Sequence, residues 1–312
     1  MLALFFIVSF YVSYCDNDVG DRWKHLELNV IPRVGFGTAG LGNKTADLIH
    51  QLLVFTSTRR VFIDTAQAEE WYSERSVRNG IIRFLLLNNI HDQSQQQFLK
   101  PMILSKIHPR HYEAAKLHGM SKKSNEILNI EWNDLDILLL HNTRCWQQHC
   151  AYKDEFYSWE DALRVLEYSR LSNNAKHIGI SNFNLPETKR MRLLSHTKLE
   201  IMQNWCDPLH QDIPIRRYAM LKNLSYIAYS SFGTQHRVAQ QSNPVISNKI
   251  LRSIAINRNV SVYKVILSWL LQTDAITIPR SSKLSRIIDN SFDQEAFLDD
   301  KELDEIISLN SL

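Results

Sequence analysis

The most constraining feature of the 312-residue sequence is a strand-then-helix unit that recurs eight times. Each unit begins with a short run rich in branched and aromatic residues and continues with a longer segment whose apolar residues have helical spacing. The strand runs are apolar on both faces, as in Leu135–Leu140, which is typical of parallel strands covered by helices. Because no polar linker or shift in composition interrupts the series, we expect a single α/β domain. Eight such units can close into a (β/α)8 TIM barrel, which is the fold we predict.

The expected elements alternate along the chain, with two consecutive helices after the seventh strand. The expected strands are Val34–Thr38, Val61–Thr65, Met102–Ile107, Leu135–His141, Lys176–Ser181, Glu200–Asn204, Ser225–Ser230 and Ala275–Pro279. The expected helices are Thr45–Thr58, Glu74–Leu87, Tyr112–Asn129, Trp159–Leu171, Pro186–Ser195, Ile215–Asn223, Ile246–Asn257, Ser261–Gln272, Ser285–Ser291 and Asp299–Leu309.

Residues 1–15 carry no charged side chain and are almost wholly apolar or hydroxylic. A membrane-spanning helix needs about 20 residues, so this stretch is short for one. It is better interpreted as a secretory signal peptide that is cut before Asp16, with Ser13 and Cys15 as the small residues at the cleavage site. No Lys or Arg precedes the apolar region, so an uncleaved anchor stays open. We therefore expect a signal peptide at 1–15, an amino-terminal extension at 16–30 and the barrel at 31–312. This organisation predicts the secretory pathway, either the endoplasmic reticulum lumen or the exterior; the alternative is the cytoplasm.

The charge distribution limits the partners that the chain can have. The formal net charge is +3, and no basic run is longer than Lys122-Lys123. A nucleic-acid-binding surface needs a clustered basic patch, so we expect no nucleic-acid partner. We also expect no stable membrane span after signal cleavage, and a monomer.

Three cysteines remain after the predicted cleavage: Cys145, Cys150 and Cys206. Cys145 and Cys150 lie in one loop and could pair in an oxidising compartment. Together with His141 and His149 they also suggest zinc, but this spacing fits no compact structural zinc site, so we predict no metal.

Glycine is scarce in this chain, and four of its nine glycines lie between Gly35 and Gly42. The segment Gly35–Gly40 matches the dinucleotide-binding fingerprint G-x-G-x-x-G, and a later strand ends in Asp64, as in a Rossmann-type dehydrogenase. However, Pro32 lies just before the short strand, and proline lacks the backbone N–H that a central parallel strand needs as a hydrogen-bond donor. The alternative is that these glycines form a loop at the mouth of a barrel.

The barrel interpretation predicts that polar groups gather at the carboxyl ends of successive strands, because those ends form the catalytic face. Five consecutive strands do end in polar residues. These residues are Asp64, Ser105 with Lys106, His141, Ser181 with Asn182, and Gln203.

Several short motifs occur in order along the chain, between about Ile31 and Leu309. They are Ile31–Thr38, Phe62–Ala66, Leu104–Lys106, Leu135–His141, Ile178–Phe183, Gln203, Cys206–Pro208, Ala228–Ser230 and Ile278–Ser282. Together these motifs resemble the aldo-keto reductase family. The resemblance implies a (β/α)8 barrel that binds NADP(H) and reduces aldehydes or ketones to alcohols by hydride transfer.

In this family a tyrosine donates the proton that the reduced carbonyl oxygen needs. A phenol has a pKa near 10, so the resemblance implies that a neighbouring cation lowers it. Lys106 matches that cation, and Asp64 matches the carboxylate that holds it. His141 matches the residue that orients the carbonyl and donates a hydrogen bond to its oxygen.

The resemblance also assigns the cofactor contacts. Ser181, Asn182 and Gln203 match the groups that hold the nicotinamide carboxamide, and Tyr229 matches the aromatic residue that stacks on the ring. Further contacts, including those to the 2′-phosphate and the adenine, are implied for Thr38, Ser230, Arg280, Ser281, Arg286 and Asn290.

The sequence departs from the family at the tyrosine itself. The expected position, five residues after Asp64, holds Glu69. A two-residue insertion that aligns Glu74 with the family's glutamate places Trp71 at the tyrosine position and Tyr72 beside it. We predict that Tyr72 is the proton donor. The alternative is a catalytically impaired protein that binds NADP(H) on the same barrel.

Overall fold

The computed structural model describes residues 31–56, 61–90, 99–112, 119, 122–124, 126–128, 135–146, 159–238, 243–291 and 297–310. Over these residues the chain forms one eight-stranded sheet, in which neighbouring strands are parallel and follow one another in sequence order. The strands are β1 (Phe36–Gly37), β2 (Phe62–Asp64), β3 (Met102–Ile107), β4 (Leu135–Leu140), β5 (Ala175–Ser181), β6 (Ile201–Trp205), β7 (Ser225–Tyr229) and β8 (Ala275–Thr277).

The sheet closes on itself where the first and last strands meet. The backbone amide of Gly35 donates to the carbonyl of Thr277 at 2.8 Å, and the amide of Thr277 donates to the carbonyl of Arg33 at 2.9 Å. Val34 forms a parallel bridge with Thr277. These bonds join β8 to the start of β1, so the predicted single-domain (β/α)8 barrel is confirmed. The Rossmann alternative is wrong, because that fold is an open sheet whose strand order departs from sequence order.

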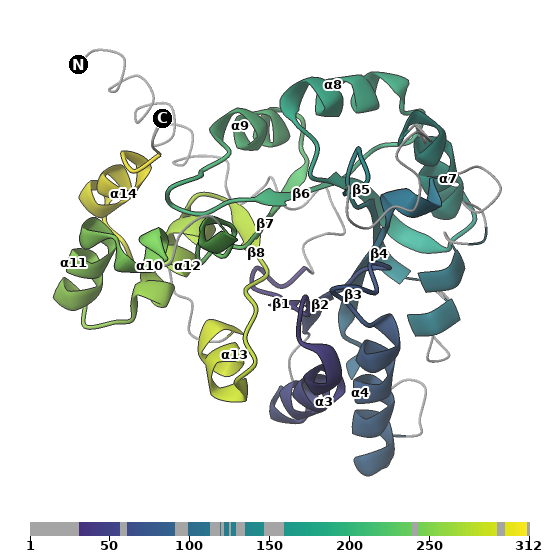
Figure 1. Cartoon of the computed structure of the whole chain (residues 1–312), viewed down its shortest axis with the longest axis horizontal. Coiled ribbons are helices and arrows are strands. Elements are labelled where there is room, and N and C mark those ends of the chain that lie inside the picture. The colour runs from purple at the N-terminus through teal and green to yellow at the C-terminus, as the bar shows by residue number, and fades with distance from the viewer. Residues whose placement is uncertain are drawn as a thin grey trace.

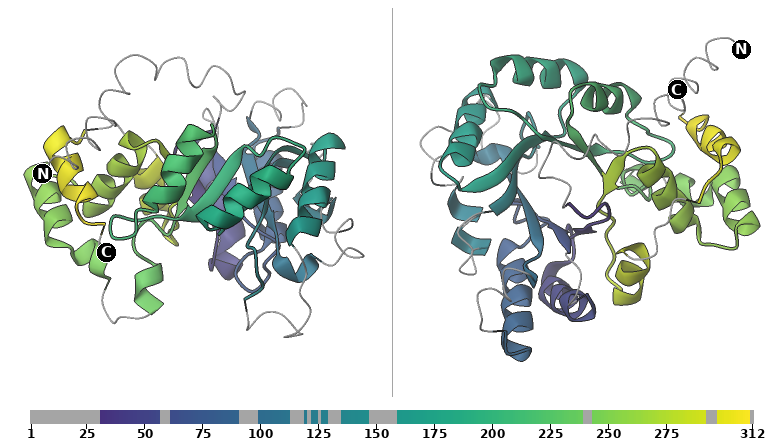
Figure 2. Two further views of the ribbon diagram at one scale, coloured as in Figure 1. Left: turned by 90° about the horizontal axis from the view of Figure 1, so that it is seen from above. Right: turned by 180° about the vertical axis from the view of Figure 1, so that it is seen from behind.

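The helices lie outside the curled sheet and surround it (Figures 1 and 2). No helix among the described ranges is long and apolar enough to cross a membrane. The helices are α3 (Thr45–Phe55), α4 (Glu74–Leu87), α7 (Trp159–Leu171), α8 (Leu185–Leu194), α9 (Ile213–Leu221), α10 (Pro244–Ser247), α11 (Lys249–Asn257), α12 (Val262–Gln272), α13 (Leu284–Ser291) and α14 (Asp300–Ile307).

Most predicted elements occur where the sequence places them, and one helix is divided. The predicted helix Ile246–Asn257 is two helices, α10 and α11, which meet at Asn248. The Asn248 side chain accepts hydrogen bonds from the amides of Ile250 and Leu251, so it caps a new helix and ends the previous one. The predicted helix Tyr112–Asn129 lies largely outside the described residues, as do the predicted signal peptide and extension.

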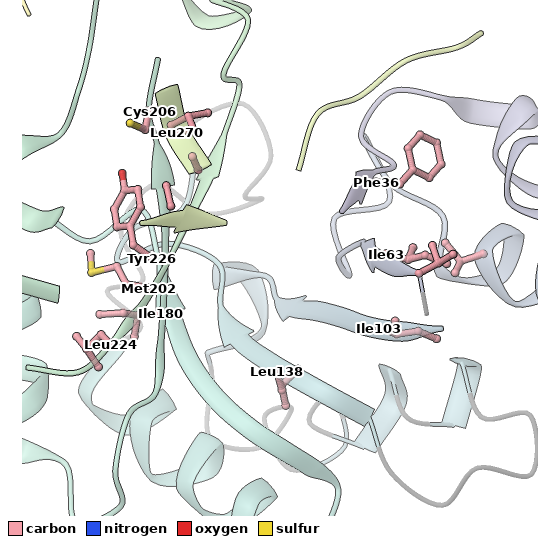
Figure 3. Close-up of a cluster of buried hydrophobic side chains, with 14 of the residues drawn as sticks. Phe36, Ile63, Ile103, Leu138, Ile180, Met202, Cys206, Leu224, Tyr226 and Leu270 are labelled. Atoms are coloured by element: carbon pink, nitrogen blue, oxygen red, sulfur yellow. The ribbon is translucent and has the colours of Figure 1, made fainter. Parts of the chain in front are cut away.

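The apolar core has two layers, because successive strand residues point to opposite faces of the sheet. The inner layer fills the barrel with residues such as Phe62, Leu104 and Ile201. The outer layer packs the sheet against the helices. Members of this layer from seven consecutive strands, shown in Figure 3, are Phe36, Ile63, Ile103, Leu138, Ile180, Met202 and Tyr226.

The clustered glycines belong to the closing seam of the barrel. A Cβ added at Gly35 would lie 2.5 Å from the Phe62 ring, and one added at Gly37 would lie 2.8 Å from the carbonyl oxygen of Ile278. Both distances are shorter than real contacts of a Cβ. Glycine at these positions therefore lets β1 approach its neighbours on both sides.

Candidate active site

The centre of the candidate site is a buried ion pair. Asp64 and Lys106 lie two residues beyond Phe62 and Leu104, so both point into the barrel. Nζ of Lys106 is 2.7 Å from Oδ1 of Asp64 and donates to the carbonyl oxygen of Thr65 at 2.9 Å. Burial lowers the pKa of Lys106, and the Asp64 carboxylate counteracts part of this effect. The pair therefore places a desolvated cation at the mouth of the barrel.

Tyr72 lies directly beside this cation. Nζ of Lys106 is above the Tyr72 ring, 5.0 Å from its centroid, and the His141 ring centroid is 6.0 Å away. The pKa of Tyr72 is well above that of an exposed phenol, first because of burial and then because of the charge of Asp64. The net shift is therefore upward, opposite to the lowering that the resemblance implies, because burial and the charge of Asp64 outweigh the lowering by neighbouring cations.

His141 faces the same space in its neutral form. His141 is 6% exposed. Burial, and after it the positive charge of Lys106, lowers the pKa of its imidazole well below the usual value. Among the described residues, Nδ1 of His141 has no hydrogen-bond partner. The Trp146 ring packs on His141 with a centroid distance of 5.0 Å. His141 can therefore donate one hydrogen bond from an uncharged ring.

The residues predicted to hold a nicotinamide form a connected network around the same mouth. The amide nitrogen of the Gln203 side chain donates to Oδ1 of Asp64 at 2.9 Å. Tyr229 donates its hydroxyl to Oδ1 of Asn182 at 2.6 Å, and the Asn182 amide donates to the hydroxyl of Ser181 at 3.1 Å. These groups belong to three neighbouring strands and the turn after β5, so the barrel brings them together.

The local sequence explains the turn that carries Asn182. Asn182 has a φ of +61°, a left-handed conformation that Asn tolerates better than most residues. Two residues later, Asn184 and Glu187 form a capping box that begins α8. The chain therefore reverses directly after β5, which leaves Ser181 and Asn182 at the rim.

The remaining predicted cofactor residues lie on the β1–β8 side of the mouth. The hydroxyl of Thr38 donates to the carbonyl oxygen of Asp64 at 2.8 Å, and Arg280 donates to the carbonyl oxygen of Ala39 at 3.1 Å. Ser281 accepts from the amide of Lys283 at 3.1 Å. Other members of the predicted set are Ser230, in the left-handed turn after β7, and Arg286 and Asn290, four residues apart on α13.

This side of the mouth fits a phosphate group. Arg280 and Arg286 are exposed and carry guanidinium groups, which suit bidentate binding of phosphate oxygens. Gly40 has a φ of +66°, and a Cβ there would lie 3.0 Å from Nη1 of Arg280. The missing side chain at Gly40 therefore keeps that guanidinium open to a ligand.

Residues beside the site include some that the strand-end pattern did not identify. Glu70, His108 and Arg110 form a polar cluster next to Tyr72, and the His108 ring centroid is 6.1 Å from that of His141. His108 follows β3 by one residue, so its place at a strand end was the one available signal.

The loop after β4 carries a disulfide. Cys145 is disulfide-bonded and directly precedes Trp146. The predicted partner, Cys150, lies outside the described residues, so the predicted pairing stays a prediction. Cys206 is a free, buried thiol.

Comparisons with known proteins agree with this geometry. A sequence profile of the Aldo/keto reductase family matches residues 33–311. The NADPH-dependent D-xylose reductase of Meyerozyma guilliermondii is 25% identical over 312 residues, which covers 90% of this chain and 93% of that protein. Aldose reductase B of Dictyostelium discoideum is 32% identical over 163 residues, and glyoxal reductase of Bacillus subtilis is 30% identical over 191 residues. The matches span 46% and 61% of the lengths of these two proteins.

Solved structures show the same fold. An aldo-keto reductase of the silkworm Bombyx mori, solved in complex with NADPH, superposes with a TM-score of 0.74 at 20% identity, over 89% of this chain and 84% of that one. The aldose reductase of Schistosoma japonicum superposes with the same TM-score, 0.74, over 90% of each chain. The family profile covers nearly the whole described chain, from the start of the barrel to its last helix. The chain belongs to the aldo/keto reductase family.

Proposed function

We propose that this protein is an NADP(H)-dependent oxidoreductase that reduces aldehydes or ketones to alcohols. The observation that carries the proposal is the buried Asp64–Lys106 pair, with Tyr72 and His141 against it at the barrel mouth. Family membership and a relative named as an NADPH-dependent reductase support the same activity.

The chain's own residues would handle the proton. NADPH, when bound, supplies the hydride. His141 is neutral and donates a hydrogen bond to the substrate oxygen, which fixes the carbonyl and stabilises the charge that grows there. Tyr72 then donates its hydroxyl proton to that oxygen. Because its pKa is raised, Tyr72 is fully protonated at neutral pH, and an alkoxide is a stronger base than a phenolate.

Lys106 and Asp64 would stabilise the phenolate that forms when Tyr72 gives up its proton. A phenolate beside the Lys106 ammonium is more stable than one in a neutral buried site, because an opposite charge at short range favours the charged form. Burial lowers the pKa of Lys106, and the Asp64 carboxylate counteracts this by favouring the charged form. In this proposal, Ser181, Asn182, Gln203 and Tyr229 hold the nicotinamide end of the cofactor.

The cofactor's other end would lie on the β1–β8 side. Arg280 and Arg286 supply positive charge for the 2′-phosphate, which distinguishes NADP(H) from NAD(H). The remaining proposed contacts are Thr38, Ser230, Ser281 and Asn290.

We expect Arg286→Ala to raise the Kd for NADPH about tenfold and to leave the Kd for NADH nearly unchanged, measured by fluorescence titration.

The decisive test combines binding and turnover. The purified full-length chain is titrated with NADPH by fluorescence and then assayed with a panel of aldehydes and ketones. Tyr72→Phe is expected to abolish reduction and to leave the Kd for NADPH within about twofold, while Trp71→Phe keeps measurable reduction. Activity that survives in Tyr72→Phe would refute the assignment of Tyr72.

The displacement of the tyrosine from the family's position favours a second candidate function, which is binding of NADP(H) without catalysis. A chain that binds NADPH tightly but reduces no carbonyl would be the impaired cofactor-binding protein, and no binding at all would refute both functions.

We also propose that residues 1–15 direct the chain into the secretory pathway and are then removed. The proposal rests on the uncharged apolar stretch that ends in Ser13 and Cys15. Expression in secretory cells should yield a mature amino terminus at Asp16 in mass spectrometry. An intact Met1 on a cytosolic protein would contradict it.

A further inference from the structure

The segment that carries Tyr72 connects β2 to α4 and is attached to β3 near both of its ends. Near its start, the amide of Gln67 donates to the carbonyl oxygen of Lys106 at 3.0 Å. At its far end, the buried carboxyl group of Glu74 accepts a hydrogen bond from the Ser105 hydroxyl at 2.5 Å. Tyr72 lies between these two points, so neither attachment alone fixes where its ring lies.

Glu70 provides a third contact, in the middle of the segment. Its Oε1 lies 3.2 Å from Nε2 of His108, and its Oε2 accepts a hydrogen bond from the guanidinium group of Arg110. Burial alone would raise the pKa of Glu70, but hydrogen bonds from its own backbone and from Arg110 lower it overall. Glu70 is therefore ionised at neutral pH and faces two groups that follow β3.

The orientation of His108 is set by Arg110. Nδ1 of His108 accepts hydrogen bonds from the backbone amide of Arg110 at 3.1 Å and from its Nε at 3.0 Å. A neutral imidazole that accepts at Nδ1 carries its hydrogen on Nε2, which is the atom that faces Glu70. The His108 side chain is fully buried, so solvent does not compete for this contact.

The contact joins a residue close in sequence to Tyr72 with a residue close in sequence to Lys106. Glu70 precedes Tyr72 by two residues, and His108 follows Lys106 by two residues. A turn joins Glu70 to Tyr72, because the amides of Trp71 and Tyr72 donate to the carbonyl oxygen of Ala68 at 2.9 and 2.8 Å. The contact between Glu70 and His108 therefore links Tyr72 to the strand that carries Lys106, in addition to the hydrogen bond that the Gly40 amide donates to the Trp71 carbonyl at 2.6 Å.

We propose that Glu70 and His108 are positioning residues that hold Tyr72 between Lys106 and His141. This inference rests on the proposed role of Tyr72 as proton donor. The pair, called here the Glu70–His108 clasp, fixes a segment whose tyrosine is displaced from the family's position. Misplacement of a reacting group by about 1 Å can lower a rate about 100-fold, so the clasp acts on turnover and leaves cofactor binding unaffected.

The test compares neighbouring carboxylates. Glu70→Ala removes the clasp, and Glu69→Ala is the matched control because Glu69 is adjacent and exposed. Hydrogen exchange of a peptide spanning 65–73 reports on the segment without any turnover. In Glu70→Ala we expect the amides of Trp71 and Tyr72 to exchange at least about tenfold faster, kcat to fall at least about tenfold, and the Kd for NADPH to stay within about twofold.

Conservative replacements separate positioning from general stability. Glu70→Gln keeps the length of the side chain and one oxygen that can accept from Arg110, but its amide nitrogen, a donor, then faces Nε2 of His108. Its exchange rate and kcat should therefore lie between those of the wild type and of Glu70→Ala, at an unchanged thermal midpoint. If Glu70→Ala does not fold, His108→Phe is measured in the same way and should show the same fast exchange.

The outcomes also separate the clasp from the proposed function. Exchange in Glu70→Ala equal to that in Glu69→Ala would overturn the clasp whatever the activity. A wild-type chain that reduces no carbonyl would contradict the proposed function, and the exchange comparison would still decide whether the clasp holds the segment.

Discussion

One oxygen atom, Oδ1 of Asp64, receives hydrogen bonds from both Lys106 and Gln203 inside the barrel. The side chains of Asp64 and Lys106 are 3% and 1% exposed, so their charges are stable only as a pair. Removing one member of a buried pair leaves the other uncompensated, whereas removing both restores balance.

This balance gives a prediction about stability. Asp64→Ala is expected to lower the free energy of unfolding by about 3–5 kcal/mol at pH 7, because Lys106 is left buried and unpaired. The double variant Asp64→Ala, Lys106→Met should be more stable than Asp64→Ala alone. Urea unfolding of the two variants and the wild type measures both effects. A double variant no more stable than the single one would show that the pairing energy is small.

A second prediction at this scale concerns His141 and acid. The unfolded imidazole titrates near pH 6.5, whereas burial keeps the folded one neutral to a much lower pH. Below about pH 6.5 the unfolded chain therefore binds more protons, and stability falls as the pH falls. Replacing His141 with Asn should reduce the loss of unfolding free energy between pH 7 and pH 5 by up to about 2 kcal/mol. Equal losses in the two proteins, measured by denaturant titration, would contradict this.

The sequence identified the residues that continue a strand pattern and missed those that depend on loop packing. Asp64, Lys106 and His141 are polar side chains at the ends of apolar strands, so the period of two placed them on the inner face. Glu70 lies in an irregular segment with no period. Its contact with His108 arises from how two loops fold over each other, which no local pattern encodes.

Among the elements beside the site, α4 packs closely on α3. Gly80 makes this approach possible, because a Cβ there would lie 2.6 Å from the carbonyl oxygen of Ala46 and 2.8 Å from Cβ of Ile49. The start of α4 carries Glu74, which is attached to β3, so the position of α4 and that of the Tyr72 segment are linked.

Gly80→Val should therefore destabilise the protein by about 2 kcal/mol, because a backbone carbonyl on α3 has to move. Gly119→Val is the control, since no atom of the described residues lies within 4 Å of a Cβ at that position. Both variants replace glycine with valine, so the change in backbone preference is the same in each. The difference between their free energies of unfolding therefore reports the packing of α4 on α3. Similar effects at the two positions would show that α3 and α4 can separate at little cost.

Element boundaries show where sequence patterns lose information. The alternation of apolar runs predicted the strands, because each run is bounded by turns and helices. The division of one predicted helix into α10 and α11 was missed, since apolar residues continue across the break at Asn248. There the hydrogen bonds of one amide side chain outweighed the apolar spacing.

For the molecule as a whole, the proposed cofactor contacts come from segments far apart in the sequence, the first at Thr38 and the last at Asn290. A ligand that binds the closed barrel but not the unfolded chain stabilises the barrel. NADPH at 100 times its Kd is expected to raise the free energy of unfolding by about 2.7 kcal/mol. Thermal unfolding should show one transition with and without NADPH. Two transitions, or a midpoint that NADPH leaves unchanged at saturation, would contradict this.

The seam between β1 and β8 also has a consequence for how the protein is made. The ribosome releases β1 before β8, yet Gly35 and Thr277 must pair for the barrel to close. Until then the nascent sheet has an open edge at β1, with backbone groups able to pair with other chains. The strands from β1 to β7 therefore leave the ribosome before the barrel can close, and the yield in a cell depends on how well that exposed edge is shielded during translation.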